Sequence, residues 1–280
     1  MSRARAEIDL SAIAENLKFI KNKSDAEILA VVKADAYGHG LLPVATAAQA
    51  AGADWLGTAL LEEAITLRNG GITKPILAWL TPPGEDFKTA IKLDIDLSIS
   101  SIELLSEILS AGQSLNKKPR VHIEVDTGMS RGGVLGDWKE LLAEVVKVAD
   151  KIEVVGLWSH FARADEPGEK MNKEQLDLFM DRVEDLSKAA ITPKYLHIAN
   201  SAATLTNKSS HKNIIRWGIG LYGLSPDVNN LGDSKSLTLH PAMRLYAKLQ
   251  LVKSVKAGVS VGYGATANTK TDTKLGVVTL

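Results

Sequence analysis

Hydrophobic positions along the chain follow two alternating patterns. Short apolar runs are each followed by a longer segment in which apolar residues recur every three or four positions. The runs have the length of buried strands, and the longer segments have the period of amphipathic helices. The predicted strands are 28–32, 53–58, 75–79, 95–98, 120–125, 154–158, 194–197 and 213–217. The predicted helices are one from Asp9 or Ser11 to Asn22, then 41–51, 60–69, 85–93, 102–111, 138–149, 172–190 and a short one near Ser201.

Strict alternation of strands and helices is typical of an α/β fold with a parallel sheet. Eight such units within about 220 residues predict a (β/α)₈ barrel of the TIM type, with an open doubly wound sheet as the alternative. We assign residues 1–235 to this barrel domain. Ligands of such barrels bind at the carboxyl ends of the strands, so residues that follow the strands are candidates for a site.

The pattern changes beyond the barrel. Residues 246–255 alternate apolar and polar positions, and glycines follow at 258, 262 and 264, which predicts strands and turns rather than helices. We therefore expect a second, β-rich domain over residues 236–280. Because residues 275–280 read as an apolar strand with no turn after it, we expect this domain to be incomplete.

Composition narrows the class of protein. Hydrophobic residues make up 45% of the chain and charged residues 24%, as in an ordinary globular protein. Basic and acidic residues are equal at 33 each, so neither nucleic acid nor a membrane is an expected partner. No signal peptide or membrane-spanning run is evident, and we expect a cytoplasmic protein. Absence of cysteine excludes disulfides and thiolate zinc sites, and the histidine spacing suggests no metal site.

Lys33 is the first residue with candidate chemistry. It ends the first predicted strand, and Gly38 and Gly40 then interrupt the chain before the next helix. A lysine in this place can simply mark where the strand meets water. It can also face a site at the carboxyl end of the barrel, where partial burial lets the amine lose its proton and form a Schiff base.

The surrounding segment, AVVKADAYGHG over residues 30–40, closely resembles the pyridoxal-phosphate lysine motif of alanine racemases. Four further segments match motifs of that family in the same order: 126–133, 158–162, 197–202 and 216–223. The resemblance implies that Lys33 holds pyridoxal 5′-phosphate as an aldimine and serves as a general base. It further implies interconversion of L-alanine and D-alanine, the latter for cell-wall peptidoglycan, by a homodimer.

The resemblance also suggests roles for individual residues. Arg131 is expected to meet the substrate carboxylate, His160 to lie against the cofactor ring, and Arg216 to face the pyridine nitrogen with His197 as its support. The remaining cofactor-binding candidates, most of them around the phosphate, are Tyr37, Asn200, Ser201, Gly218 and Ile219. From the residues alone, Ser201 could equally be part of a simple helix cap. The glycines after Arg216 match a dinucleotide fingerprint, but Pro226 prevents the helix which that fingerprint requires.

Two features depart from the family pattern. Glu124 stands where many members carry a carbamylated lysine, and we infer that it supplies the same negative charge without modification. The second base of the family, a tyrosine that reaches in from the partner subunit, has no counterpart, since Tyr263 matches an earlier tyrosine. Two alternatives therefore stand beside an alanine racemase. One is a pyridoxal-phosphate-binding module without racemase activity. The other is a related enzyme on the same cofactor barrel that acts on another small amino acid such as serine or cleaves a β-hydroxy amino acid.

Overall fold

The computed structural model describes residues 3–279 and divides the chain into two compact units. We call Leu10–Ala242 the barrel unit. The strand unit combines the residues before Leu10 with those from Met243 onward. All predicted site residues belong to the barrel unit.

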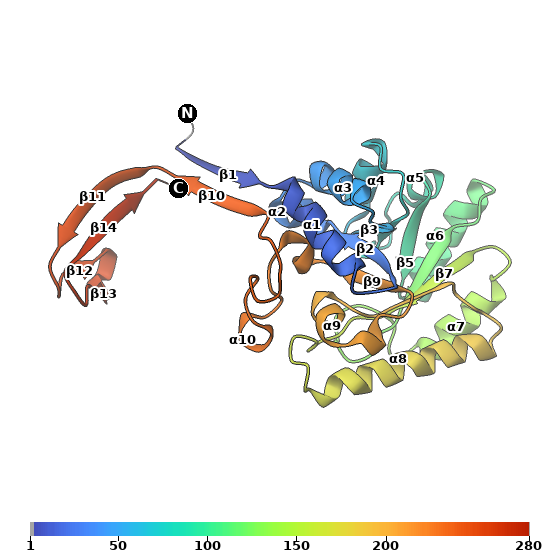
Figure 1. Ribbon diagram of the computed structural model, residues 1–280. Helices are drawn as coiled ribbons and strands as arrows, with labels where there is room; N and C mark the ends of the chain where they lie inside the picture. Colours follow the sequence, from blue (N-terminus) through green and yellow to red (C-terminus); the bar gives the residue numbers. More distant parts are fainter. Residues whose placement is uncertain (1–2, 280) are drawn as a thin grey trace. The chain divides into compact units, whose positions relative to one another are not determined.

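Eight parallel strands form the centre of the barrel unit (Figure 1). Their order in the sheet is β8-β7-β6-β5-β4-β3-β2-β9. Two backbone hydrogen bonds join the edge strands, from Asn213 N to Leu196 O at 3.1 Å and from Arg216 N to Ala199 O at 3.0 Å. The predicted barrel is confirmed. Its strands are β2 (Glu27–Val31), β3 (Trp55–Thr58), β4 (Ile76–Ala78), β5 (Ile95–Ile99), β6 (Arg120–Glu124), β7 (Glu153–Trp158), β8 (Tyr195–His197) and β9 (Ile214–Trp217).

Helices lie on the outside of this sheet (Figure 1). The longer helices each bury one apolar face, as the helical period predicts. For example, α6 buries Leu104, Leu105 and Ile108, and its first turn is capped by Ser101 Oγ, which accepts from Leu104 N at 3.1 Å. The helices are α1 (Leu10–Lys21), α3 (Leu41–Ala50), α4 (Leu61–Asn69), α5 (Phe87–Lys92), α6 (Ile102–Ser114), α7 (Trp138–Lys147), α8 (Lys170–Lys188), α9 (Ser201–Thr206) and α10 (Val228–Leu231). Short 3₁₀ turns are η1 (Lys208–Ser210) and η2 (Ile219–Tyr222).

The interior of the barrel has its own small core. It consists of Leu29, Val31, Trp55, Leu77, Val155, Tyr195 and Ile214. Gly57 on β3 makes room for it, since a Cβ there would lie 2.3 Å from Leu29 Cδ2 and 2.4 Å from the Trp79 ring. Large side chains thus fill the lower barrel and leave space only at the rim where the strands end.

The segment after Lys33 is not the simple glycine loop that the sequence predicts. Residues 34–37 adopt φ between 52° and 54°, so α2 (Lys33–Gly38) contains a left-handed helical turn. Each such residue costs roughly 1–2 kcal/mol when it is not glycine. Asp35 holds the turn, because its backbone O accepts from Gly40 N at 3.0 Å and its Oδ1 accepts from Leu41 N at 2.7 Å.

The strand unit consists of three antiparallel pairs. β1 (Ala4–Ile8) pairs with β10 (Met243–Ala247), β11 (Leu249–Val255) with β14 (Thr273–Val278), and β12 (Ser260–Val261) with β13 (Ala267–Asn268), beside the turn η3 (Tyr263–Ala265). The strand β1 was not predicted from the sequence. Within residues 3–279, no helix is both long and apolar enough to cross a membrane.

Candidate active site

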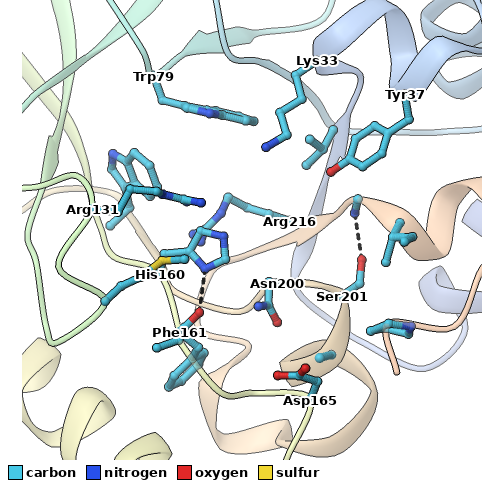
Figure 2. Close-up of a pocket in the computed structure, with 18 residues that line it drawn as sticks. Lys33, Tyr37, Trp79, Arg131, His160, Phe161, Asp165, Asn200, Ser201 and Arg216 are labelled. Carbon is cyan, nitrogen blue, oxygen red and sulfur yellow. Dashed lines mark hydrogen bonds between the residues drawn. The ribbon is translucent and has the colours of Figure 1, made fainter. Parts of the chain in front are cut away.

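A cavity of about 340 Å³ lies at the carboxyl ends of the barrel strands. Figure 2 shows the side chains of Lys33 and Tyr37 directed into the same space as those of Arg131, His160 and Arg216. Parallel strands bring these residues together because their carboxyl ends meet at one rim. Of the ten predicted site residues, nine line the cavity: Lys33, Tyr37, Arg131, His160, Asn200, Ser201, Arg216, Gly218 and Ile219. The tenth, His197, lies behind Arg216.

Lys33 follows β2 directly and reaches into the cavity, where its Nζ lies 6.0 Å from the centre of the Tyr37 ring. Burial lowers the pKa of the lysine, and the positive charges of Arg131 and Arg216 lower it further, while Glu63 acts in the opposite direction. A lowered pKa increases the fraction of neutral amine near pH 7. Neutral amine is the form that attacks a carbonyl group or accepts a proton.

Tyr37 occupies the last left-handed position of α2 before Gly38. Its ring packs on Tyr222 with centroids 4.8 Å apart, and the Tyr222 hydroxyl donates to Val31 O at 2.9 Å. Burial raises the pKa of Tyr37, so its hydroxyl stays protonated and can donate a hydrogen bond into the cavity. The unusual backbone of α2 therefore brings Lys33 and Tyr37, four residues apart, to one cavity.

A second group of donors lies across the cavity from Lys33. Ser201 Oγ accepts from the amides of Gly218 at 3.0 Å and Gly220 at 3.3 Å (Figure 2 shows the first). A Cβ at Gly218 would lie 3.1 Å from the Tyr37 hydroxyl, so a side chain there would crowd this corner. Asn200 begins α9 and its Oδ1 accepts from Ala203 N at 2.9 Å. The hydroxyls of Tyr37 and Ser201, beside the glycine turn at Gly218, can donate to the oxygens of a phosphate group.

Arg216 extends from β9 into the cavity and is buried. Its guanidinium donates to Ser159 O at 2.7 Å and to His197 O at 3.1 Å, and it contacts His197 Nδ1 at 3.2 Å. It also lies over the Trp158 ring, 4.9 Å from the centroid. Burial lowers the pKa of Arg216 to about 9, since these partners are neutral, and the group still carries its charge at pH 7.

Arg131 lies in the glycine-rich loop after β6 and lines the cavity at an exposed position. Glu124, at the end of β6, is buried beneath this loop, and a Cβ at Gly132 would lie 2.8 Å from its Oε1. Burial raises the pKa of Glu124 to about 7 against the opposing charges of Arg216 and Arg131. The carboxyl group is therefore close to the balance between its neutral and charged forms at physiological pH.

His160 lines the cavity as a neutral imidazole. Its Nδ1 donates to Phe161 O at 3.0 Å, which leaves Nε2 without the proton (Figure 2). Burial and the charges of Arg216 and Arg131 lower the pKa of His160 to about 3. A neutral ring can pack against a flat ligand without adding a further charge to a site that already holds two arginines.

Comparison with known proteins identifies relatives of this chain. The family model "Alanine racemase, N-terminal domain" matches residues 8–226. An alanine racemase from Salinispora arenicola is 45% identical over 283 residues, which cover all of this chain and 75% of that protein. This chain belongs to the alanine racemase family.

Solved alanine racemases also share its structure. The enzyme from a D-cycloserine-producing Streptomyces lavendulae superposes with a TM-score of 0.92 at 42% identity, over 99% of this chain and 73% of that one. The enzyme from Streptomyces coelicolor gives 0.91 at 41% identity, over 98% and 74%. The activity of the family is that of an isomerase, the interconversion of L-alanine and D-alanine.

Some cavity residues of this alanine racemase homologue were not predicted from its sequence. Trp79 and Trp158 form part of the wall, with ring centroids 6.2 Å apart. Both follow or end barrel strands, so an aromatic residue at a strand's carboxyl end was an available signal. Tyr222, which supports Tyr37, offered none, because its contact depends on how η2 folds against α2.

Proposed function

We propose that the barrel cavity binds pyridoxal 5′-phosphate and that Lys33 moves the α-proton of alanine during racemisation. The observation that supports this most directly is the position of Lys33: a lysine with a lowered pKa faces an arginine and a phosphate-sized group of donors in one cavity. A lysine that only marked the end of a strand would not need these partners.

The donor set fits the proposed cofactor. Tyr37, Ser201 and the backbone at Gly218 and Ile219 would hold the phosphate, and His160 and Arg216 would hold the ring, with Asn200 fixing the start of α9. When bound, pyridoxal phosphate supplies an electron-withdrawing group that makes the α-proton of the attached amino acid acidic. Lys33 Nζ would take up or deliver that proton on one face of the substrate, and inversion needs a second group that does the reverse on the other face.

The two arginines have separate tasks in this proposal. Arg131, exposed at the rim, would bind the substrate carboxylate, for which a guanidinium is well shaped. Arg216 carries only hydrogen-bond donors and keeps its charge, so it has no acidic proton to transfer to a ring nitrogen. A ring nitrogen that receives no proton makes the cofactor a weaker electron sink. A proton removed from Cα is then replaced quickly, which suits racemisation better than transamination.

The biological setting belongs to the same proposal. By its resemblance to the family, we expect a cytoplasmic homodimer that supplies D-alanine for peptidoglycan. In such a dimer a tyrosine of the partner subunit would serve the face of the substrate opposite Lys33.

The first experiment is proton NMR of the purified chain with pyridoxal phosphate in deuterium oxide, given D-alanine and L-alanine separately. We expect the α-proton signal of D-alanine to disappear, because the resemblance assigns that face to Lys33. Exchange from both isomers with inversion would show that the second face is served as well. Lys33→Arg, which keeps the charge but cannot form an imine, should abolish exchange, and Lys92→Arg on α5 should not.

The alternatives predict different results. A chain that binds the cofactor, seen as imine absorbance, but exchanges neither isomer would refute the proposal and favour a binding module. Exchange confined to another small amino acid, with serine as the first to try, would refute alanine as the substrate. Exchange that survives Lys33→Arg would refute the role of the lysine.

A further inference from the structure

A chain of buried hydrogen bonds leads from Arg216 down into the barrel. His197 Nδ1 lies 3.2 Å from Arg216 Nη1, and His197 Nε2 lies 3.0 Å from His122 Nδ1. His122 Nε2 then lies 3.2 Å from Asp96 Oδ2. Both imidazoles are fully buried and Asp96 is 1% exposed. The chain crosses four strands that are far apart in sequence: β9, β8, β6 and β5.

The donors and acceptors available on each side chain fix which atom donates in every hydrogen bond of this series. A guanidinium has only donors, so His197 Nδ1 must accept from it and the proton of a neutral His197 must sit on Nε2. That proton is donated to His122 Nδ1, which therefore has none of its own. His122 then carries its proton on Nε2 and donates it to the Asp96 carboxylate. A protonated His122 would instead turn a donor toward His197 Nε2–H.

The surroundings keep the rings in place. The Trp158 ring stacks on His197 with an interplanar angle of 1°, and the edge of Trp55 meets His122 at a centroid distance of 5.6 Å. Gly156 leaves the space that the His122 ring occupies, because a Cβ there would lie 2.3 Å from Nδ1. Only a residue without a side chain allows β7 to pass this close to the imidazole.

The far end of the chain is anchored by charge. Arg120 donates to Asp96 from Nε at 2.7 Å and from Nη2 at 3.1 Å, and its Nη1 donates to Glu153 at 2.7 Å. Burial alone would raise the pKa of Asp96, but the hydrogen bonds from His122 and Arg120 and the charge of Arg120 outweigh it, so the pKa lies below its ordinary value. Asp96 is thus a carboxylate at neutral pH and can only accept.

We propose that His122 and Asp96 are positioning residues for Arg216, because they hold His197 in the tautomer whose Nδ1 lone pair faces the guanidinium. This inference rests on the proposed function, because it concerns how Arg216 is held for the task proposed for it in the cavity. Asp96 orients His122 as the aspartate of a catalytic triad orients its histidine. Here that histidine acts on a second one, His197, which in turn faces a cation that must stay charged and fixed.

The histidine tautomers can be measured directly from the ¹⁵N NMR spectrum of the protein, with its histidine rings labelled and without cofactor. We expect both His197 and His122 to be neutral, with a protonated Nε2 and a pyridine-type Nδ1. A His197 ring protonated at Nδ1, or an imidazolium at either position, would refute the proposal. Because this spectrum needs no cofactor and no turnover, it tests the chain of hydrogen bonds even if the proposed function fails.

Variants then test the link to the reaction in the holoenzyme. The Asp96→Asn side chain offers an N–H donor as well as a carbonyl acceptor. His122 Nε2 is then no longer obliged to donate, so its tautomer is no longer fixed. We expect kcat to fall on the order of 10-fold, with KM for alanine within about 2-fold, and a second tautomer to appear for His122. Gly156→Ala moves the His122 ring without removing a charge and should lower kcat in the same way, which covers the case of an Asp96→Asn chain that does not fold.

Tyr195→Phe is the matched control. Tyr195 lies in the same barrel interior and packs on Trp55, but it is not part of the series of hydrogen bonds from Arg216 to Asp96. The substitution removes only its hydrogen bond to Glu27. We expect its kcat and ring spectrum to equal those of the unmutated protein. An equal loss of kcat in Tyr195→Phe and Asp96→Asn would show a general softening of the barrel and refute a positioning role, as would unchanged kcat and ring spectrum in Asp96→Asn.

Discussion

Replacing Glu124 by glutamine should make the folded protein more stable above neutral pH. Glutamine has nearly the shape of a protonated glutamate, so the substitution fixes this buried position in its neutral form. The native structure raises the pKa of Glu124 from an ordinary 4.5 to about 7, mainly through burial. The folded protein therefore opposes loss of this proton more strongly than the unfolded chain does.

The size and the pH window of the effect follow from these two pKa values. Between pH 4.5 and about 7 the folded state keeps a proton that the unfolded state has lost, so the free energy of unfolding falls as the pH rises. A pKa difference of about 2.5 corresponds to about 3 kcal/mol, at about 1.4 kcal/mol per pKa unit. Glu124→Gln should equal the unmutated protein near pH 4.5 and exceed its stability by up to about 3 kcal/mol above pH 7.

Urea unfolding followed by tryptophan fluorescence at several pH values between 5 and 8.5 measures this difference. Glu140→Gln on α7 is the control, since it makes the same chemical change at an exposed position. Equal stabilities of Glu124→Gln and the unmutated protein at pH 8, or a less stable variant, would refute the reasoning. The same variant removes a negative charge beside Arg131, and we expect it to raise KM for alanine at pH 8.

Two further substitutions test the site and the barrel core. Ser201→Ala removes a hydroxyl of the phosphate corner and the acceptor for the amides of Gly218 and Gly220, so a spectroscopic titration should show roughly 10-fold weaker binding of pyridoxal phosphate; unchanged affinity would exclude the hydroxyl from that corner. Gly57→Ala places a Cβ 2.3 Å from Leu29 Cδ2 and should lower the free energy of unfolding by roughly 1–3 kcal/mol in the same urea assay, whereas an unchanged midpoint would mean that the interior can yield.

Local patterns in the sequence were sufficient for the barrel. Each strand is a short apolar run and each helix has an apolar face, and both signals are contained in neighbouring residues. The motif around Lys33 is equally local, and the rule that ligands bind where parallel strands end placed nine of the ten predicted residues at one cavity.

Only the tertiary structure decided the features that depend on distant contacts. The pairing of β1 with β10 joins segments more than 230 residues apart. The ARAEI run alternates apolar and polar residues, but it is short and contains two alanines, which are depleted in strands, so its partner is what makes it a strand. The left-handed turn after Lys33 runs against local preference and persists because Asp35 and the packing of Tyr37 hold it. His122 was not among the site residues predicted from the sequence, and the fold buries it between Asp96 and His197.

The same division explains the electrostatics of the site. Sequence identified Lys33, Glu124 and Arg216 as residue types with the right chemistry, since chemistry is a property of the side chain. Burial and neighbouring charges then lower the pKa of Lys33, raise that of Glu124 to about 7 and lower that of Arg216 to about 9. Desolvation and Coulomb interactions act through space between residues on different strands, so only the folded barrel sets them.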